Sequence, residues 1–317
     1  MNVVDLFSGC GGLSLGFQNA GMNVVAAYDN WPAAVSVYAT NFNHPVNQLD
    51  LSEEDSAAAH ISRYNPDMII GGPPCQDFSS AGLRDEDNGR GNLTLSYARI
   101  VAKVCPLWFV MENVATITKT NKLTGAKAIF RQAGYGLTQV VLNAALCGVP
   151  QKRKRYFLIG RLHTADDFLL PYIKQQLAKK EMTVKEYLGN KIDIEFYYRH
   201  PRSYARRGVF SVNEPSPTIR GVNRPIPAGY PIHPNDPVSS LKGIRPLTTK
   251  ERSMLQTFPE NYNFIGSKSE IEQMIGNAVP VNLGTFVATA IQGYIDNSPL
   301  TSSAVSVKQL SLFSDEE

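Results

Sequence analysis

Short apolar segments alternate with helical stretches through the first half of the chain, and this alternation constrains the fold more than any other feature. The segments typical of strands lie at residues 3–7, 24–27, 67–70, 107–111, 140–142 and 156–159. The stretches typical of helices lie at residues 13–19, 31–41, 93–104 and 122–132. Because a strand followed by a helix usually returns to a parallel neighbour, the pattern predicts an α/β fold with a parallel, doubly wound sheet.

The chain changes character near residue 161. Residues 196–246 are rich in proline, glycine, tyrosine and arginine and have no helical period, which predicts a second, small domain of irregular structure. A helical period returns at 281–295, and the last stretch is polar. We therefore expect four parts, namely a large domain at 1–163 plus 276–297, a second domain at 164–243, a hinge segment at 244–275 and a flexible tail at 298–317.

Composition sets the class of protein. The 317 residues are 43% hydrophobic and 19% charged, which is typical of a soluble globular protein, and no apolar run has the length of a membrane span. No signal peptide opens the sequence, so we expect a cytoplasmic protein. The four cysteines lack Cys-x-x-Cys spacing, so neither a zinc site nor a disulfide framework is indicated. A net charge of +3 is too small to indicate a nucleic-acid partner without its distribution.

A glycine-rich loop follows the first predicted strand, in the sequence Asp5-Leu6-Phe7-Ser8-Gly9-Cys10-Gly11-Gly12-Leu13. Glycines let the backbone approach a ligand closely, and the missing Gly-Lys-Ser/Thr ending argues against a P-loop. Asp29 follows the second strand, where an acidic residue commonly binds ribose hydroxyls, and Asp50 is placed to accept a hydrogen bond from an adenine amine. Together they predict an adenosine-containing cofactor, although each acid alone is more typical of a helix cap or a solvated loop.

A thiol is presented at the end of another strand. Pro73-Pro74-Cys75 directly follows the apolar run 68–70, and the two prolines stiffen the segment that carries Cys75. Glu112 follows the strand at 107–111, so both side chains are expected at the carboxyl edge of the sheet, where open α/β folds place their chemistry. The alternatives are a small buried cysteine and a glutamate in a surface salt bridge.

These residue types suit methylation of cytosine at carbon 5, which is a poor nucleophile. A cysteine thiolate that adds to carbon 6 generates an enamine that accepts a methyl group. Glu112 suits an acid that hydrogen-bonds ring nitrogen 3, for which burial must raise its pKa. Arg153 and Arg155 are candidates to hold the base carbonyl, orient Glu112 and lower the thiol pKa, the alternative being a solvated basic run.

The chain resembles the bacterial-type DNA (cytosine-5)-methyltransferases. The segments that carry the resemblance, in the order of the family, are DLFSGCGGLSLGF, GGPPCQDFS, GRGNL, FVMENV, QKRKRYFLIG, RPLTTKERSMLQTFP and IGNAVPVNLG. The resemblance implies a Rossmann-like methyltransferase sheet and transfer of a methyl group from S-adenosylmethionine to a flipped cytosine in duplex DNA, leaving S-adenosylhomocysteine. It implies the modification enzyme of a restriction-modification system, acting as a monomer in the bacterial cytosol or nucleoid. Within it, Cys75 is the nucleophile, Glu112 its acid partner, and Arg153 and Arg155 belong to the same catalytic site.

The resemblance also implies further site residues and a helix at 281–295 that packs on the catalytic domain. The expected S-adenosylmethionine pocket consists of Phe7, Gly9, Gly11, Asp29, Asp50, Leu93, Asn277 and Val279. A mobile loop from Gln76 to about Arg90 closes over the flipped base, with Gln76 and Ser79 as DNA contacts. Asp29 stands where the family has a longer glutamate and Asn30 where an apolar residue often covers the adenine, so we expect a looser cofactor site.

Recognition of DNA is expected from the second domain, the target recognition domain of the family. Residues 197–224 hold one acid, Glu214, against six arginines, namely Arg199, Arg202, Arg206, Arg207, Arg220 and Arg224. Arginine suits guanine edges and phosphates, whereas about half of such side chains are simply solvated. Thr218-Ile219 resembles a dipeptide of these domains. The expected DNA contacts are Arg199, Arg202, Thr218, Arg220 and Arg224, and the tract resembles domains that read palindromes with a central CG step.

Three other readings remain open. A tRNA-methylating member of the family shares the catalytic core, but it lacks an extended recognition domain and carries a Cys-Phe-Thr tract that is absent here. An amino-methyltransferase would have an aromatic residue after Pro-Pro, where this chain has Cys75. A catalytically inert DNA-binding module would not need Cys75, Glu112 and Arg155.

The tail contains a short apolar motif in a polar, serine-rich stretch. Gln309-Leu310-Ser311-Leu312-Phe313 resembles the pentapeptide by which bacterial DNA enzymes bind the replicative sliding clamp. Leu312 and Phe313 would fill a pocket of that partner. A tail that folds back on the protein, or that has no partner, is the alternative.

Overall fold

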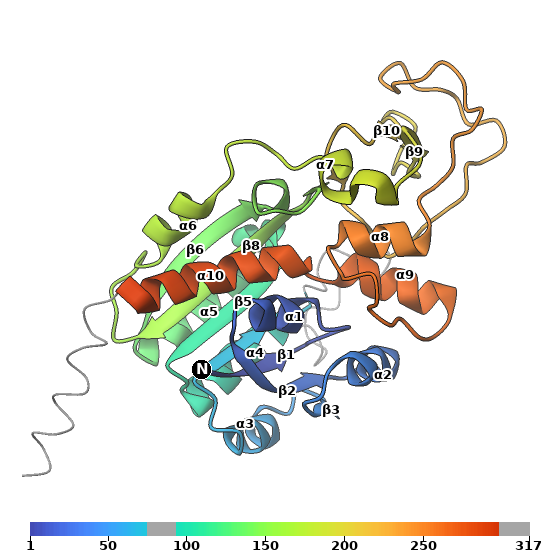
Figure 1. The fold of residues 1–317 in the computed structure, drawn as a ribbon. Helices are drawn as coiled ribbons and strands as arrows, with labels where there is room; N and C mark the ends of the chain where they lie inside the picture. The colour runs from blue at the N-terminus through green and yellow to red at the C-terminus, as the bar shows by residue number, and fades with distance from the viewer. Residues whose placement is uncertain (75–92, 298–317) are drawn as a thin grey trace, which may run out of the picture.

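The computed structural model describes residues 1–74 and 93–297. Its centre is a seven-stranded sheet with the order β3-β2-β1-β4-β5-β8-β6 (Figure 1). The strands are β1 (Asn2–Leu6), β2 (Asn23–Asp29), β3 (Val46–Gln48), β4 (Met68–Gly71), β5 (Trp108–Val114), β6 (Tyr135–Asn143) and β8 (Lys154–Leu162). Every strand expected from the sequence is present, and β3 is an additional one.

The sheet is mixed, so the expectation of an entirely parallel sheet is wrong at one strand. Strands β3, β2, β1, β4 and β5 pair in parallel, whereas β8 is antiparallel to both β5 and β6. The cause is the short connection between β6 and β8, which holds only η3 (Ala144–Leu146) and the two-residue strand β7 (Gln151–Lys152). A parallel return needs a crossover of a dozen or more residues, so this connection makes an antiparallel pair instead.

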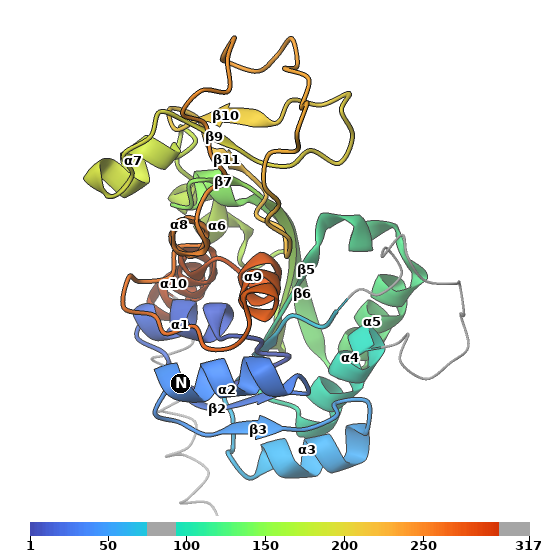
Figure 2. The same ribbon diagram turned by 90° about the vertical axis from the view of Figure 1, so that its right-hand side faces the viewer.

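Helices cover both faces of the sheet (Figure 2). One apolar cluster joins the sheet to α1 (Gly12–Asn19), α6 (Leu170–Gln176) and α10 (Val281–Asn297). The opposite cluster joins it to α3 (Glu54–Ser62), α4 (Leu93–Val104) and α5 (Asn121–Gln132), with η2 (Ala115–Lys119) after β5. Successive strand residues alternate between the clusters, as Val3 and Val4 do, because side chains of a strand point to opposite faces.

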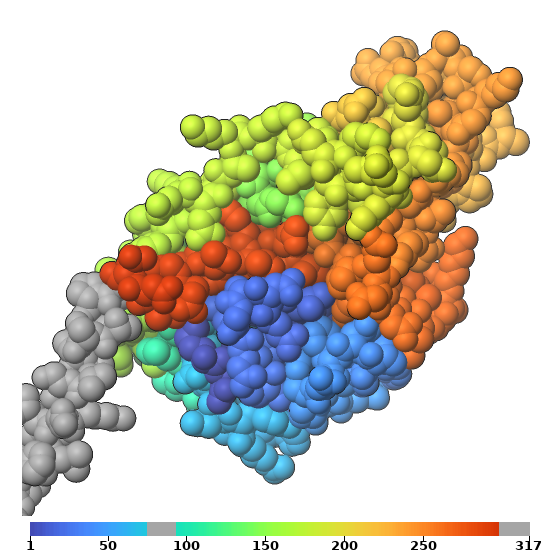
Figure 3. Space-filling view, in the orientation of Figure 1, coloured from blue at the N-terminus to red at the C-terminus, as the bar shows by residue number. Residues whose placement is uncertain are grey.

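The N-terminal and C-terminal helices pack directly on one another. A Cβ added at Gly16 of α1 would lie 2.8 Å from the Cα of Gly284 in α10, so both backbones approach closely where glycine allows it. Figure 3 shows α10 in red alongside the N-terminal residues in blue. Helix α2 (Pro32–Asn41) lies beside β2 and β3.

The second part of the chain is largely irregular, as its composition predicts. It begins with the short helices α7 (Val184–Leu188) and η4 (Gly189–Lys191). From there to residue 248, its regular elements are the antiparallel strands β9 (Phe196–Tyr198) and β10 (Val209–Ser211) and the two-residue strand β11 (Ser216–Pro217). Strand β11 pairs in parallel with β7, which joins this part to the sheet domain. The part has its own apolar cluster, which includes Tyr197, Phe210 and Ile219.

Helical structure returns earlier than the sequence predicted. Two helices, α8 (Thr249–Leu255) and α9 (Lys268–Asn277), lie in the segment expected to be a hinge. Each is short but begins at a capping box, Thr248 with Glu251 in α8 and Ser267 with Glu270 in α9. In a capping box each of the two side chains accepts a hydrogen bond from the backbone N–H of the other residue. Helices this short show little periodicity, so the capping boxes were the signal in the sequence.

Within residues 1–74 and 93–297, one stretch has the length and composition of a membrane span. It is Lys268–Asn297, which contains α9 and α10, but 67% of its most apolar window is buried inside the protein. That burial is typical of a core helix, in line with the packing of α10 against α1.

Candidate active site

The carboxyl ends of β1, β4 and β5 meet at one edge of the sheet. Leu6 pairs with Gly71, and Gly71 pairs with Met111, so the segments that follow these strands begin side by side. Because β8 is antiparallel, its amino end lies at this same edge, where Arg155 pairs with Val114. A parallel β8 would have put Arg155 at the opposite edge of the sheet.

Glu112 and Arg155 form a buried ion pair at this edge. The Nε of Arg155 lies 2.9 Å from Oε1 of Glu112, with 14% and 10% of the two side chains exposed. The pair is therefore not the surface salt bridge that was the alternative reading of Glu112. Burial raises the pKa of Glu112, and the charges of Arg155 and Arg153 oppose the shift. The net shift is upward, so Glu112 takes up a proton more readily than an exposed glutamate does.

The exit of β4 lies directly over Glu112. A Cβ added at Gly72 would lie 3.2 Å from Oε2 of Glu112, so glycine leaves that oxygen uncrowded. The side-chain amide of Asn113 donates to the carbonyl of Pro73 at 2.9 Å and fixes the segment that leads to Pro74. Cys75, Gln76, Ser79 and the loop to about Arg90 lie outside the described residues.

Arg153 lies close to this pair, but its hydrogen bonds go elsewhere. Its guanidinium, in a residue only 1% exposed, donates to the backbone carbonyls of Ile219 at 3.0 Å, Gly276 at 3.0 Å and Ala278 at 3.1 Å. Burial lowers its pKa, as does the charge of Arg155. In this conformation Arg153 therefore joins two backbone segments, one at Ile219 and one at residues 276–278.

The glycine loop after β1 is tied to the end of β2. The backbone N–H of Gly9 donates to Oδ2 of Asp29 at 2.7 Å, and the N–H of Trp31 donates to Oδ1 at 2.8 Å. Burial raises the pKa of Asp29, against the effect of these backbone donors. A carboxylate offers about four acceptor positions, so beside its backbone donors Gly9, Trp31 and Asn30 this one can accept a further hydrogen bond.

The loop is open on one side and closed on the other. Gly9 has φ +55°, and a Cβ there would meet nothing within 4 Å, whereas a Cβ at Gly12 would overlap the carbonyl of Val279. Gly11 has φ +87°, and Phe7 has φ +56°, which is uncommon for a non-glycine residue and often marks a functional site. Of the expected cofactor residues, the structure thus gathers Phe7, Gly9, Gly11, Asp29 and Val279 around one loop.

The other three expected cofactor residues lie at the ends of elements. Asp50 follows β3, accepts from the N–H and the hydroxyl of Ser52, and adjoins Leu49, whose N–H donates to the carbonyl of Asp29. Leu93 begins α4 and is partly buried, and Asn277 ends α9 with an exposed side chain.

The arginines expected to contact DNA fall into two groups. The guanidinium of Arg199 donates to the carbonyl of Thr218 at 2.8 Å, and that of Arg220 donates to the carbonyl of His200. Arg202 and Arg224 are exposed and make no hydrogen bond or ion pair with the described residues. Thr218 uses its hydroxyl to donate to the carbonyl of Lys152 at 2.8 Å. The first group therefore builds the domain, and the second is available to a partner.

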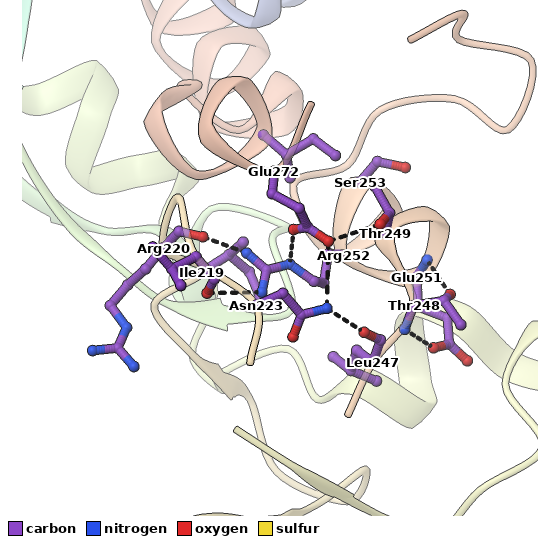
Figure 4. A network of polar contacts seen from close by, with 12 residues as sticks. Ile219, Arg220, Asn223, Leu247, Thr248, Thr249, Glu251, Arg252, Ser253 and Glu272 are labelled. Atoms are coloured by element: carbon purple, nitrogen blue, oxygen red, sulfur yellow. Dashed lines mark hydrogen bonds and ion pairs between the residues drawn. The ribbon is translucent and has the colours of Figure 1, made fainter. Parts of the chain in front are cut away.

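A buried network that the sequence analysis did not assign supports this region (Figure 4). Arg252 in α8 and Glu272 in α9 form an ion pair at 2.7 Å, with 6% and 4% of their side chains exposed. Arg252 also donates to the carbonyls of Arg220 and Val222, and Glu272 accepts from Thr249 at 2.7 Å. Arg252 stands in a segment that carried the family resemblance, but neither its type nor its spacing revealed a partner.

Known proteins are similar to this chain over most of its length. The family model for C-5 cytosine-specific DNA methylases matches residues 1–293. Type II methyltransferase M.HindV of Haemophilus influenzae is 55% identical over 303 residues, which cover 95% of this chain and 99% of the relative. Type II methyltransferase M.HgiDI of Herpetosiphon aurantiacus is 55% identical over 296 residues, which cover 93% and 96%.

Solved structures share the fold. A putative DNA modification methyltransferase from an E. coli prophage superposes with a TM-score of 0.69 at 24% identity, covering 94% of this chain and 100% of that one. The S. pombe Dnmt2 methyltransferase superposes with a TM-score of 0.67 at 17% identity, covering 92% and 98%. Identities this low show the fold alone, whereas the match over residues 1–293 shows more: the chain belongs to the family of C-5 cytosine-specific DNA methylases.

Proposed function

We propose that this cytosine-5 DNA methyltransferase modifies one cytosine within a specific duplex sequence, with Cys75 as nucleophile and Glu112 as the acid that activates the base. The observation that carries the proposal is the buried Glu112–Arg155 pair directly beneath Gly72, three residues before Cys75. A carboxyl with a raised pKa at this place can donate a hydrogen bond to ring nitrogen 3 of cytosine.

The proposed reaction begins at Cys75. The thiolate of Cys75 forms a bond to carbon 6 while Glu112 stabilises the charge that develops on nitrogen 3, and carbon 5 then becomes nucleophilic. Arg155 holds the carboxyl of Glu112 in one orientation. After methylation, loss of the proton from carbon 5 and expulsion of the thiolate restore the aromatic ring.

The family implies use of S-adenosylmethionine, which supplies the methyl group. The residues around the glycine loop fit an adenosine cofactor, because Gly9 leaves open space beside the backbone and the carboxylate of Asp29 can accept a further hydrogen bond from a ribose hydroxyl. We assign Phe7, Gly11 and Val279 to the same pocket, with Asp50, Leu93 and Asn277 at its rim.

The family implies that DNA is the substrate, in which the target base must be extruded from the duplex before such chemistry. The recognition domain presents arginines that have no hydrogen bond or ion pair with the described residues. Arg202 and Arg224 are exposed, whereas Arg199, Thr218 and Arg220 have partners within the protein. We assign base or phosphate contacts first to Arg202 and Arg224. The names of the two 55% identical relatives support a role in a Type II restriction-modification system. We expect a cytoplasmic monomer.

Bisulfite sequencing of DNA from cells that express the protein tests the function and gives the recognition sequence. We expect one methylated cytosine context with the native protein and none with Cys75→Ser. Duplex DNA that contains 5-fluorocytosine at that position should form a covalent adduct with the native protein alone. Methylation of tRNA without methylation of duplex DNA would favour the RNA alternative instead.

A second partner is proposed from the tail alone, which lies outside the described residues. Gln309, Leu310, Leu312 and Phe313 match a clamp-binding pentapeptide, and docking there would bring the enzyme to newly made hemimethylated DNA. A peptide of residues 305–317 should bind a purified sliding clamp, and the same peptide with Leu312→Ala and Phe313→Ala should not. Absence of binding in calorimetry rules the clamp out and leaves methyl transfer on short duplexes unaffected.

A further inference from the structure

The segment 218–222 of the recognition domain is held by guanidinium groups along its backbone. The carbonyl of Thr218 accepts from Arg199, that of Ile219 from Arg153, and those of Arg220 and Val222 from Arg252. The guanidinium group is planar and rigid, so each of these donors holds its carbonyl in a defined position. The segment is therefore fixed before any DNA binds.

The same segment is attached to the strand that leads into the catalytic site. Strand β11 pairs with β7 through Ser216 and Gln151, and Oε1 of Gln151 accepts from the N–H of Ile219 at 2.9 Å. The hydroxyl of Thr218 donates to the carbonyl of Lys152 at 2.8 Å. These contacts end at Arg153, two residues before the Arg155 that pairs with Glu112.

The segment also touches the turn between α9 and α10. A Cβ added at Gly276 would overlap the backbone of Arg220 and Gly221, so only glycine permits this approach. The carbonyls of Gly276 and Ala278, which flank Asn277, both accept from Arg153. The guanidinium of Arg153 thus donates hydrogen bonds both to segment 218–222, at Ile219, and to the turn that holds Asn277 and Val279.

We propose that Arg153 is a positioning residue that couples reading of the DNA sequence to binding of the cofactor. The proposal rests on the cofactor role assigned above to Asn277 and Val279. When a cognate base pair contacts residues 218–224, the hydrogen bonds of Arg153 to Ile219 and to the turn around Asn277 transmit the effect to the backbone of the cofactor site. Coupling of two sites is reciprocal, so cognate DNA must tighten binding of the cofactor product by the same factor by which that product tightens binding of DNA.

Binding of S-adenosylhomocysteine to the full-length protein tests the coupling. Its Kd is measured by calorimetry in three states: without DNA, with the duplex found by bisulfite sequencing, and with a duplex altered at one base pair other than the target cytosine. For the native protein we expect binding at least about 5-fold tighter with the cognate than with the altered duplex, the lower end of typical coupling.

Arg153→Lys keeps the charge but replaces the rigid guanidinium fork by one ammonium group, which cannot reproduce its three hydrogen bonds to two separate segments. In Arg153→Lys we expect the Kd of S-adenosylhomocysteine to differ by less than about 2-fold between the cognate and the altered duplex, which is the loss of the cognate preference. Its Kd without DNA should stay within about 3-fold of native. Arg245→Lys is the matched control, because Arg245 pairs with Glu251 at 2.7 Å and should keep the native preference.

Three outcomes overturn the coupling: a native protein without cognate preference, an Arg153→Lys protein that keeps it, or one that loses S-adenosylhomocysteine binding even without DNA. If thermal melting shows that Arg153→Lys is unfolded, Thr218→Val decides, since it removes only the hydrogen bond to Lys152. A reduced preference then supports the coupling, and an unchanged one refutes it. Failure of the native protein to methylate duplex DNA or to bind S-adenosylhomocysteine would instead count against the proposed function.

Discussion

The Nε of Arg155 lies 2.9 Å from Oε1 of Glu112 because β8 runs antiparallel to β5. This direction places the beginning of one strand beside the end of the other and buries both charges together. Removing one partner of such a pair leaves an uncompensated buried charge, which commonly destabilises a protein by about 3–5 kcal/mol. Variants of the pair must therefore keep shape and hydrogen bonding if they are to report on chemistry.

Glu112→Gln keeps the shape of the carboxyl and an oxygen that can accept from Arg155, and it removes the acid function. Because the charge of Arg155 loses its partner, thermal melting must first show that the variant is folded. We expect single-turnover methylation to slow by roughly 10²–10⁴-fold, the usual contribution of a positioned acid, with DNA affinity close to native. Glu54→Gln, which weakens a pair with Arg99, a side chain that is 45% exposed, is the control and should leave the rate unchanged. A rate within a few-fold of native in Glu112→Gln would make Glu112 a structural residue.

The sequence predicted the parallel half of the sheet and the place of Glu112, because apolar periodicity and the order of strands and helices are local signals. It could not predict the direction of β8, which depends on the shortness of the connection from β6. It also grouped Arg153 with Arg155, although their guanidinium groups have different partners. The Arg252–Glu272 pair could not be predicted either, because tertiary packing of two short helices brings the two side chains together.

Gly9→Ala tests the cofactor loop. The left-handed backbone at Gly9 (φ +55°) costs an alanine about 1–2 kcal/mol, and the new methyl group would occupy the open space proposed for the cofactor. Gly21 is a matched control, because it has φ +81° and equally open surroundings outside the proposed pocket. We expect a similar loss of stability in both variants and weaker S-adenosylmethionine binding in Gly9→Ala alone. Equal cofactor affinities in calorimetry would place the cofactor elsewhere.

Arg224→Ala and Arg220→Ala should differ, although the sequence assigned both to base reading. Arg224 is exposed and unpaired among the described residues, so its loss should weaken binding to the cognate duplex by about 1–3 kcal/mol more than binding to random duplex. Arg220 bonds the carbonyl of His200, so its loss should also lower the thermal stability of the protein. Arg99→Ala, in α4 and outside the recognition domain, controls for charge. A uniform loss with a shallower salt dependence in Arg224→Ala would mark a phosphate contact.

Asp5 should make the stability of the protein depend on pH. It is fully buried beneath the glycine loop, and burial raises its pKa from 3.8 to about 7, against a hydrogen bond of 2.6 Å from the hydroxyl of Ser14. The folded state thus binds the proton more tightly than the unfolded state. The stability that this group contributes is therefore complete below about pH 4 and is lost as the pH rises to about 7.

Asp5→Asn, which resembles the protonated carboxyl in shape, should remove this contribution. In urea denaturation between pH 4 and 7.5, we expect the free energy of unfolding of the native protein to fall more steeply with pH, by up to about 1.4 kcal/mol per unit, than that of Asp5→Asn. Asp29 and Glu112 also have raised pKa values, so the variant keeps part of the slope. Ser14→Ala removes the hydrogen bond that opposes the shift, so its loss of stability should extend to higher pH than in the native protein. Equal slopes for native protein and Asp5→Asn would mean that Asp5 is ionised throughout, and the unpartnered Oδ1 of its carboxyl would then need a donor that the described residues do not supply.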